Sequence, residues 1–198
     1  MSLRIEKLTE KNFADYEKLT SCESGGGCYC AFWHQKIASM QEWDQRKKEN
    51  PQLNRQTILD KVLTGFHVGV LAYRGDELIA WISVGPIIDT YWFWRRAIQL
   101  GEPAKNIAGI TCITIAKEHR SKGIQAELLT SLSEYGKTQG WTRIEGYPFE
   151  ESTYKQHGRD ISWPGNAKGF ENAGFQHNGA HWLSQPGWDR AVFGKDLS

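Results

Sequence analysis

A strand that runs through a short basic loop into an amphipathic helix is the feature that most constrains the fold of this chain. Within residues 113–129, Ile113, Thr114 and Ile115 are β-branched, as is typical of a strand. After the loop, apolar side chains recur at a helical period, at Ile124, Leu128, Leu129, Leu132 and Tyr135. A strand followed directly by a helix predicts a mixed α/β fold.

The loop itself predicts an anion site. It contains Arg120, Ser121, Lys122 and Gly123. The first N–H groups of a helix have no partner within the helix, and the helix dipole is positive at that end. With Arg120 and Lys122 beside them, these groups favour a ligand that carries phosphate.

The composition limits the partners of the chain. With 198 residues and a formal net charge of +1, it is long enough for a full core and has no global field that attracts nucleic acid or acidic membranes. No apolar run reaches the ~20 residues of a membrane span, and the N-terminal residues lack the apolar core of a signal peptide. The 4 Cys are too few for a disulfide scaffold. We therefore expect a cytoplasmic protein with reduced thiols.

The remaining elements follow from periodicity and from turn signals. Strands are expected at residues 3–8, 68–73, 77–84, 107–115, 142–147, 175–183 and 190–193. Helices are expected after Thr9, over the polar segment 35–50, from Asn54 onward, and over 124–140 and 166–173. A loop is expected between residue 147 and the last helix. The order β-α-α-β-β-β-α-β-α-β-β predicts one mixed α/β domain over residues 1–198.

This order and the basic loop together resemble the GNAT superfamily of acyl-CoA-dependent N-acyltransferases. The family signature at the strand–helix junction is Arg/Gln-x-x-Gly-x-Gly/Ala. Arg120 and Gly123 match it, whereas Gln125 stands where the family usually has Gly or Ala. A short helix that ends in Gly-Phe is a second landmark, and Gly174 and Phe175 fit it. The turn at residues 26–33 is similar to a Cys-aromatic-Cys element in one branch of the family.

The resemblance implies a single mixed, mostly antiparallel sheet with helices on both faces, and acetyl-CoA as co-substrate. The loop amides would hold the pyrophosphate, and the preceding strand would pair with the pantetheine arm. The N–H group of Ile113 would then donate to the thioester carbonyl. The residues expected at the cofactor are Ile113, Thr114, Ile115, Arg120, Ser121, Lys122, Gly123, Ile124, Gln125, Ala126 and Phe170.

The catalytic groups are less determined. Many family members place a Tyr acid four residues before the Gly-Phe pair, where this chain has Phe170. Three explanations stay open: the thiolate leaves without a donor, Tyr147 replaces the missing phenol, or the protein binds acyl-CoA as a non-catalytic sensor. Glu145 shares a strand face with Tyr147 and is the candidate base, directly or through water. Glu118 and His119, in the loop, are weaker candidates.

Two further segments concern the acceptor. Cys28, Cys30 and His34, with Cys22 upstream, have a spacing that a zinc site permits, but no second motif completes four ligands, so we expect no metal. A zinc-dependent interaction domain is the second alternative after the sensor. Otherwise this turn packs on the sheet and borders the acceptor pocket.

The aromatic and basic insert at residues 91–96 is predicted to form a lid or wall over the acceptor; a homodimer contact comes second and a nucleic-acid surface last. The sequence thus predicts an N-acetyltransferase that acts by direct attack of a primary amine on the thioester. Its partner would be a small-molecule or peptide amine, with no nucleic acid and no membrane.

Overall fold

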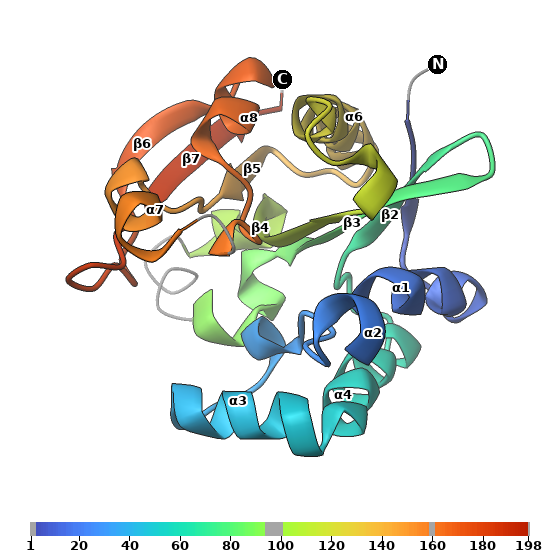
Figure 1. Cartoon of the computed structure of the whole chain (residues 1–198). Coiled ribbons are helices and arrows are strands. Elements are labelled where there is room, and N and C mark those ends of the chain that lie inside the picture. Colours follow the sequence, from blue (N-terminus) through green and yellow to red (C-terminus); the bar gives the residue numbers. More distant parts are fainter. Residues whose placement is uncertain (1–2, 94–100, 159–160, 198) are drawn as a thin grey trace.

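The chain folds around one twisted sheet. The computed structural model describes residues 3–93, 101–158 and 161–197, and in these it shows a seven-stranded sheet with the order β1-β2-β3-β4-β5-β7-β6 (Figure 1). The strands are β1 (Arg4–Lys7), β2 (Val70–Arg74), β3 (Glu77–Pro86), β4 (Ile107–Ile115), β5 (Arg143–Gly146), β6 (Gln176–Ala180) and β7 (Ala191–Asp196). β4 and β5 pair in parallel and the other neighbours are antiparallel. The predicted fold class is confirmed.

Helices cover both faces of the sheet. One face carries α1 (Phe13–Thr20), α2 (Cys22–Gly25), α3 (Met40–Glu49) and α4 (Pro51–Leu63), and the other carries α6 (Ile124–Thr138) and α8 (Ala167–Asn172) (Figure 1). The apolar stripe of α6 forms because Leu128, Leu129 and Leu132 recur at helical spacing, and all three are fully buried against the sheet. Burial of each such side chain contributes about 1.5–3 kcal/mol to stability.

Two local predictions were wrong. Asn54 does not begin a helix, because α4 starts at Pro51, whose missing N–H costs nothing in the first turn. Asn54 is instead fully buried inside α4 and donates from Nδ2 to the carbonyl oxygen of Gly27 at 2.9 Å, which anchors the glycine-rich turn. The segment after β5 is not all loop, because it contains α7 (Glu151–His157).

Candidate active site

The sheet divides between β4 and β5. These two strands pair only from Ile107–Arg143 to Ile110–Gly146. Beyond that point β3 pairs Ser83 with Cys112 and Val84 with Ile110, so that Thr111 forms a β-bulge. A bulge bends its strand, and bulges are common beside active sites. β4 therefore continues to Ile115 with one edge free of β5.

That edge of β4 is covered by the chain's own groups. The N–H of Ile113 donates to the carbonyl oxygen of Trp163 at 2.7 Å. The Nε of Arg120 donates to the carbonyl oxygen of Ile115 at 2.8 Å. The Ile113 N–H and the Ile115 carbonyl oxygen belong to the stretch of β4 that the resemblance predicts to pair with the pantetheine arm. The Ile113 N–H is therefore already hydrogen-bonded within the chain, and a thioester carbonyl that used it would have to replace the Trp163 oxygen.

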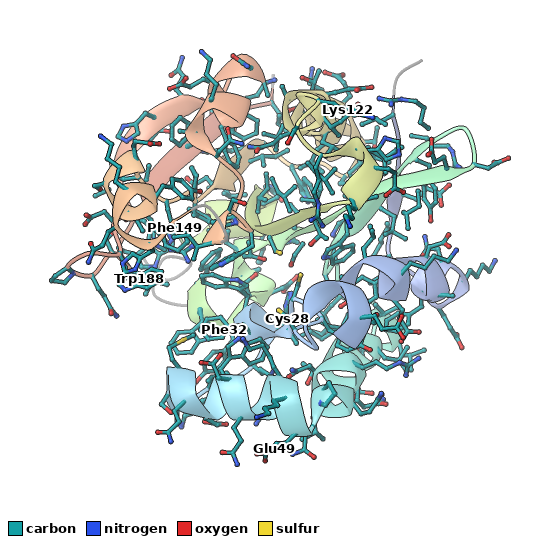
Figure 2. All side chains as sticks on the ribbon, in the orientation of Figure 1. Cys28, Phe32, Glu49, Lys122, Phe149 and Trp188 are labelled. Carbon is teal, nitrogen blue, oxygen red and sulfur yellow. The ribbon has the colours of Figure 1, made fainter. Side chains whose placement is uncertain are left out.

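The basic loop lies at the end of this edge and leads into α6. Ser121 and Gly123 have φ values of 59° and 72°, so the loop turns through the left-handed region before the helix begins at Ile124. A Cβ on Gly123 would meet no atom within 4 Å, so the glycine is needed for its conformation and leaves open space above the backbone. Arg120, Ser121, Lys122 and Gly123 are exposed, and Figure 2 shows Lys122 beside α6, across the sheet from Cys28 and Phe32.

The side chain of Gln125 faces the protein interior. Its Oε1 accepts from the backbone N–H and the Nδ2 of Asn166 at 3.1 and 2.8 Å, and its Nε2 donates to the Asn166 carbonyl oxygen at 3.0 Å. Asn166 also caps α8 by accepting from the Gly169 N–H at 2.9 Å. Gln125 thus joins the start of α6 to the start of α8, which explains why a long side chain replaces the usual small residue. Only its backbone is left for a phosphate.

Phe170 belongs to the core. Its side chain is fully buried, stacks on Phe193 with ring centroids 5.7 Å apart, and fills the space that a Cβ on Gly146 would occupy. The expected contact between Phe170 and the cofactor stays a prediction, and the ring is enclosed by the core as completely as Glu145 and Tyr147 are.

Glu145 and Tyr147 lie together below the end of β5. Both are 1% exposed, and the Tyr147 hydroxyl donates to Glu145 Oε2 at 3.2 Å. The other carboxylate oxygen accepts from the Nε of Arg143 at 3.1 Å. The Tyr147 hydroxyl would lie 3.1 Å from a Cβ on Gly109, directly across from the last paired stretch of β4. The structure therefore brings the two predicted catalytic groups into one hydrogen-bonded pair next to the division of the sheet.

An aromatic box around Arg190, formed by Trp33, Phe149 and Trp163, lies at this end of the site, and no sequence pattern predicts it. The guanidinium carbon lies 4.1 Å from the ring centroid of Phe149, 4.7 Å from that of Trp163 and 5.5 Å from that of Trp33. Nη1 donates to the Tyr147 carbonyl oxygen at 3.4 Å. Burial lowers the pKa of the guanidinium from 12.5 to about 10.

The N-terminal cysteine turn packs beneath the sheet. The Cys30 thiol lies in hydrogen-bond contact with those of Cys28 and Cys112, and these contacts raise its pKa. It also accepts from the Trp81 ring N–H at 3.3 Å. His34 does not join the thiols: among the described residues, no three of these ligand atoms come within 4.8 Å of one another. The side chain of Cys22 and residues 94–100, which include Trp94, Arg95 and Arg96 of the predicted lid, lie outside the described residues.

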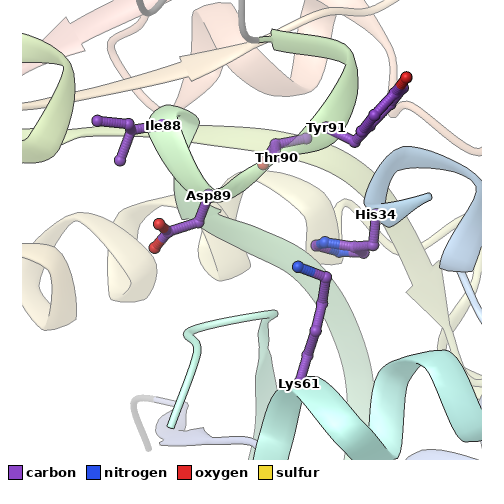
Figure 3. A pocket seen from close by; sticks show the side chains of 6 residues that line it. All are labelled: His34, Lys61, Ile88, Asp89, Thr90 and Tyr91. Carbon is purple, nitrogen blue, oxygen red and sulfur yellow. The ribbon is translucent and has the colours of Figure 1, made fainter. Parts of the chain in front are cut away.

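His34 instead lines a pocket of about 470 Å³ with Lys61, Ile88, Asp89, Thr90 and Tyr91 (Figure 3). Both of its ring nitrogens are buried and lack a hydrogen-bond partner in the described part of the chain. Burial, with a smaller effect from the Lys61 ammonium, lowers the pKa of His34 to about 3. The neutral imidazole ring of His34, the residue after Trp33, therefore lines this pocket.

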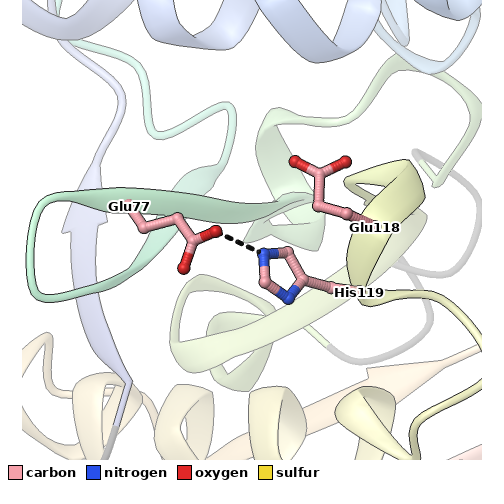
Figure 4. Close-up of side chains that lie close together, drawn as sticks. All are labelled: Glu77, Glu118 and His119. Carbon is pink, nitrogen blue, oxygen red and sulfur yellow. Dashed lines mark hydrogen bonds and ion pairs between the residues drawn. The ribbon is translucent and has the colours of Figure 1, made fainter.

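Glu77, Glu118 and His119 bring three possible metal-ligand atoms within 4.8 Å of one another (Figure 4). His119 Nε2 lies 3.0 Å from Glu77 Oε1. Both glutamates are exposed. The contact between His119 and Glu77 links the residues just before the basic loop to the start of β3. Glu118 and His119 are thus placed beside β3, whereas Glu145 and Tyr147 are placed at the end of β5.

The sequence model of the Acetyltransferase (GNAT) family matches residues 14–154, which is more than half of the chain. The divided sheet and the basic loop define an acyltransferase of this class. The chain therefore belongs to the GNAT acetyltransferase family. No curated protein matches the sequence.

Solved structures support the same fold. The aminoglycoside acetyltransferase AAC(6')-Ib in complex with ribostamycin and coenzyme A has a TM-score of 0.62 at 16% identity, covering 99% of this chain and 94% of that one. The same enzyme crystallised with acetyl-CoA gives 0.60 at 16% identity, with coverage of 99% and 94%. A ribosomal-protein-alanine N-acetyltransferase from Brucella melitensis gives 0.55 at 15% identity, with coverage of 98% and 99%. Among the described residues, no helix is long and apolar enough to cross a membrane.

Proposed function

We propose that this chain transfers an acetyl group from acetyl-CoA to a primary amine of a small molecule or peptide. The observation that carries the proposal is the division of β4 from β5 beside the basic loop and the first turn of α6. The strand edge offers backbone groups to the amides of a pantetheine arm, and the helix N-terminus offers N–H donors to a pyrophosphate. Similar folds have been crystallised with coenzyme A and with acetyl-CoA.

The pyrophosphate would lie on the amides of residues 120–126, with Arg120 and Lys122 adding positive charge. Arg120 now contacts the carbonyl oxygen of Ile115, so its guanidinium would turn from strand to phosphate as the donor binds. The thioester carbonyl would take the place of the Trp163 oxygen on the Ile113 N–H. That N–H would then stabilise the charge that develops on the carbonyl oxygen.

The chemistry is direct attack without a covalent enzyme intermediate. The neutral amine forms a bond to the thioester carbon, the C–S bond breaks, and its electron pair leaves with sulfur. Tyr147 is the proposed proton donor to the thiolate. Glu145 is the proposed acceptor of the amine proton, directly or through water, and its contact with the Tyr147 hydroxyl lets the pair restore its protons between turnovers.

Isothermal titration with acetyl-CoA and with CoA, followed by thiol release across a panel of amines, tests this function. We expect saturable binding of both ligands and turnover with at least one amine. Tyr147→Phe should lower kcat about 10²-fold, in line with the loss of one general acid, while the affinity for acetyl-CoA stays unchanged. Absence of binding at millimolar ligand would overturn the proposal, and unchanged rates of the variant across pH would exclude the role of Tyr147.

A further inference from the structure

The guanidinium of Arg190 has few polar partners in the part of the chain that the structure describes. Among these residues no carboxylate forms an ion pair with it, and the Tyr147 carbonyl oxygen accepts a hydrogen bond from it at 3.4 Å. A guanidinium has five N–H donors, so most of its donor capacity has no protein acceptor among these residues. The three rings around it attract the charge, but the side chains of Phe and Trp carry no hydrogen-bond acceptor for its N–H groups.

Arg55 and Arg143, in contrast to Arg190, form ion pairs with carboxylates. Arg55 also stacks on a ring, with its guanidinium carbon 5.2 Å from the Phe13 centroid, but Glu17 accepts from its Nε at 2.7 Å. Arg143 is paired with Glu145 and Asp196. A desolvated charge is costly unless it is paired, so an Arg held among rings without a carboxylate is suited to an anion that comes from outside.

The position of Arg190 indicates which ligand this anion belongs to. The guanidinium touches Trp163, whose carbonyl oxygen caps the Ile113 N–H, and it touches the carbonyl of Tyr147, which follows directly on β5. Arg190 therefore contacts one residue that is hydrogen-bonded to β4 and one residue that directly follows β5. The basic loop expected to hold the donor's phosphates lies at the other end of that division, so Arg190 faces the end where the acceptor amine would arrive.

We infer that Arg190 binds an anionic group of the acceptor, and that the acceptor is an amine carrying a carboxylate a few bonds away, as in an amino acid. This inference rests on the proposed function and narrows its substrate class. A planar carboxylate fits the guanidinium in a bidentate pair, and the rings of Trp33, Phe149 and Trp163 lie within 5.5 Å of the guanidinium carbon. A polycationic acceptor would instead meet like charge here.

Matched acceptors test the inference. Each of a series of amino acids is compared with its neutral carboxamide as acceptor for acetyl-CoA, with rates corrected for the fraction of neutral amine. We expect the wild-type protein to prefer the acid about tenfold or more in kcat/KM. Arg190→Gln should remove that preference, mainly through KM, so that the acid and its carboxamide become equivalent acceptors. Arg190→Lys should retain part of it, because the charge stays while the planar fork is lost.

Arg55→Gln is the matched control, because it removes a ring-stacked guanidinium far from the divided sheet; the preference for the acid should survive. A direct binding readout uses the intrinsic fluorescence of the tryptophans, two of which flank Arg190. Titration of the wild-type protein with the same amino acids should give a saturable change that Arg190→Gln lacks. If Arg190→Gln does not fold, the Lys variant and the wild-type titration carry the test.

The outcomes separate the two proposals. If acetyl-CoA does not bind, or no amine is acetylated, the proposed function fails, while the fluorescence titration still reports on anion binding at Arg190. If acetylation occurs but carboxamides or polyamines are equal or better acceptors, the inference is overturned and the function stands. An acid preference that persists in Arg190→Gln also overturns it.

Discussion

The hydrogen bond from the Ile113 N–H to the Trp163 carbonyl oxygen predicts that the Trp163 segment moves when acyl-CoA binds along β4 as proposed. Tyr154 stabilises the segment around Trp163, because its buried hydroxyl donates to the Gly165 carbonyl oxygen at 2.9 Å. Tyr154→Phe removes this bond and keeps the ring, which packs edge-on against Phe149. The substitution therefore weakens the closed state without changing any group assigned to acyl-CoA.

The expected magnitude follows from the hydrogen bond between the Tyr154 hydroxyl and the Gly165 carbonyl oxygen. A buried hydrogen bond between neutral groups contributes about 1 kcal/mol net. Binding of acetyl-CoA then no longer has to overcome the free energy of this hydrogen bond, which helps to keep the Trp163 oxygen on the Ile113 N–H. The dissociation constant for acetyl-CoA should therefore fall about fivefold. Isothermal titration measures this change directly, and the rate of association by stopped flow should increase with it.

Tyr135→Phe is a matched control. It removes a hydroxyl whose oxygen lies 2.9 Å from His67 Nε2, near the C-terminal end of α6. It should leave the affinity for acetyl-CoA unchanged. The reasoning is refuted if Tyr154→Phe binds acetyl-CoA with the wild-type affinity or more weakly, since the Trp163 segment would then belong to the donor-bound state.

Three further changes test the packing and the electrostatics. Gln125→Ala should lower the free energy of unfolding by about 1–3 kcal/mol, because Asn166 loses its buried partners; chemical denaturation measures it. Gly146→Ala should cost about 1–3 kcal/mol, since the new Cβ would overlap the Phe170 ring, and a lower Tm reports it. Burial lowers the pKa of His67 from 6.5 to about 4, so the unfolded state takes up a proton first. Stability should therefore fall as the pH drops from 6.5 towards 4, and His67→Gln should flatten this loss in thermal unfolding.

Local sequence patterns predict the part of the fold that local forces determine. The strand at residues 107–115 and the start of the following helix at Ile124 were predicted at the observed positions, because β-branching and helical periodicity act over a few neighbours. α7 was missed because only Thr153 and Tyr154 in it are buried, which is too short an apolar signal to count as a period.

The parts of the site that the sequence could not predict depend on distant partners. Gln125 owes its orientation to Asn166, which is 41 residues further along the chain. The box around Arg190 takes one ring from the N-terminal turn, one from the segment after β5 and one from the segment before α8. No spacing in the sequence indicates that these rings meet.

Trp163 links the two ligand sites that we propose. Its carbonyl oxygen occupies the Ile113 N–H, and its ring forms one wall around Arg190. Under the proposed function acyl-CoA replaces the first contact, and a shift of the Trp163 backbone would move the ring as well, so we expect the two ligands to alter each other's affinity. Thermodynamic linkage requires the factor to be the same in both directions. The fluorescence titration with a carboxylate-bearing acceptor, repeated with saturating CoA, should therefore shift by the same factor as the CoA titration repeated with saturating acceptor. Independent binding in both experiments would show that Trp163 keeps its place when the donor binds, and that the thioester does not use the Ile113 amide.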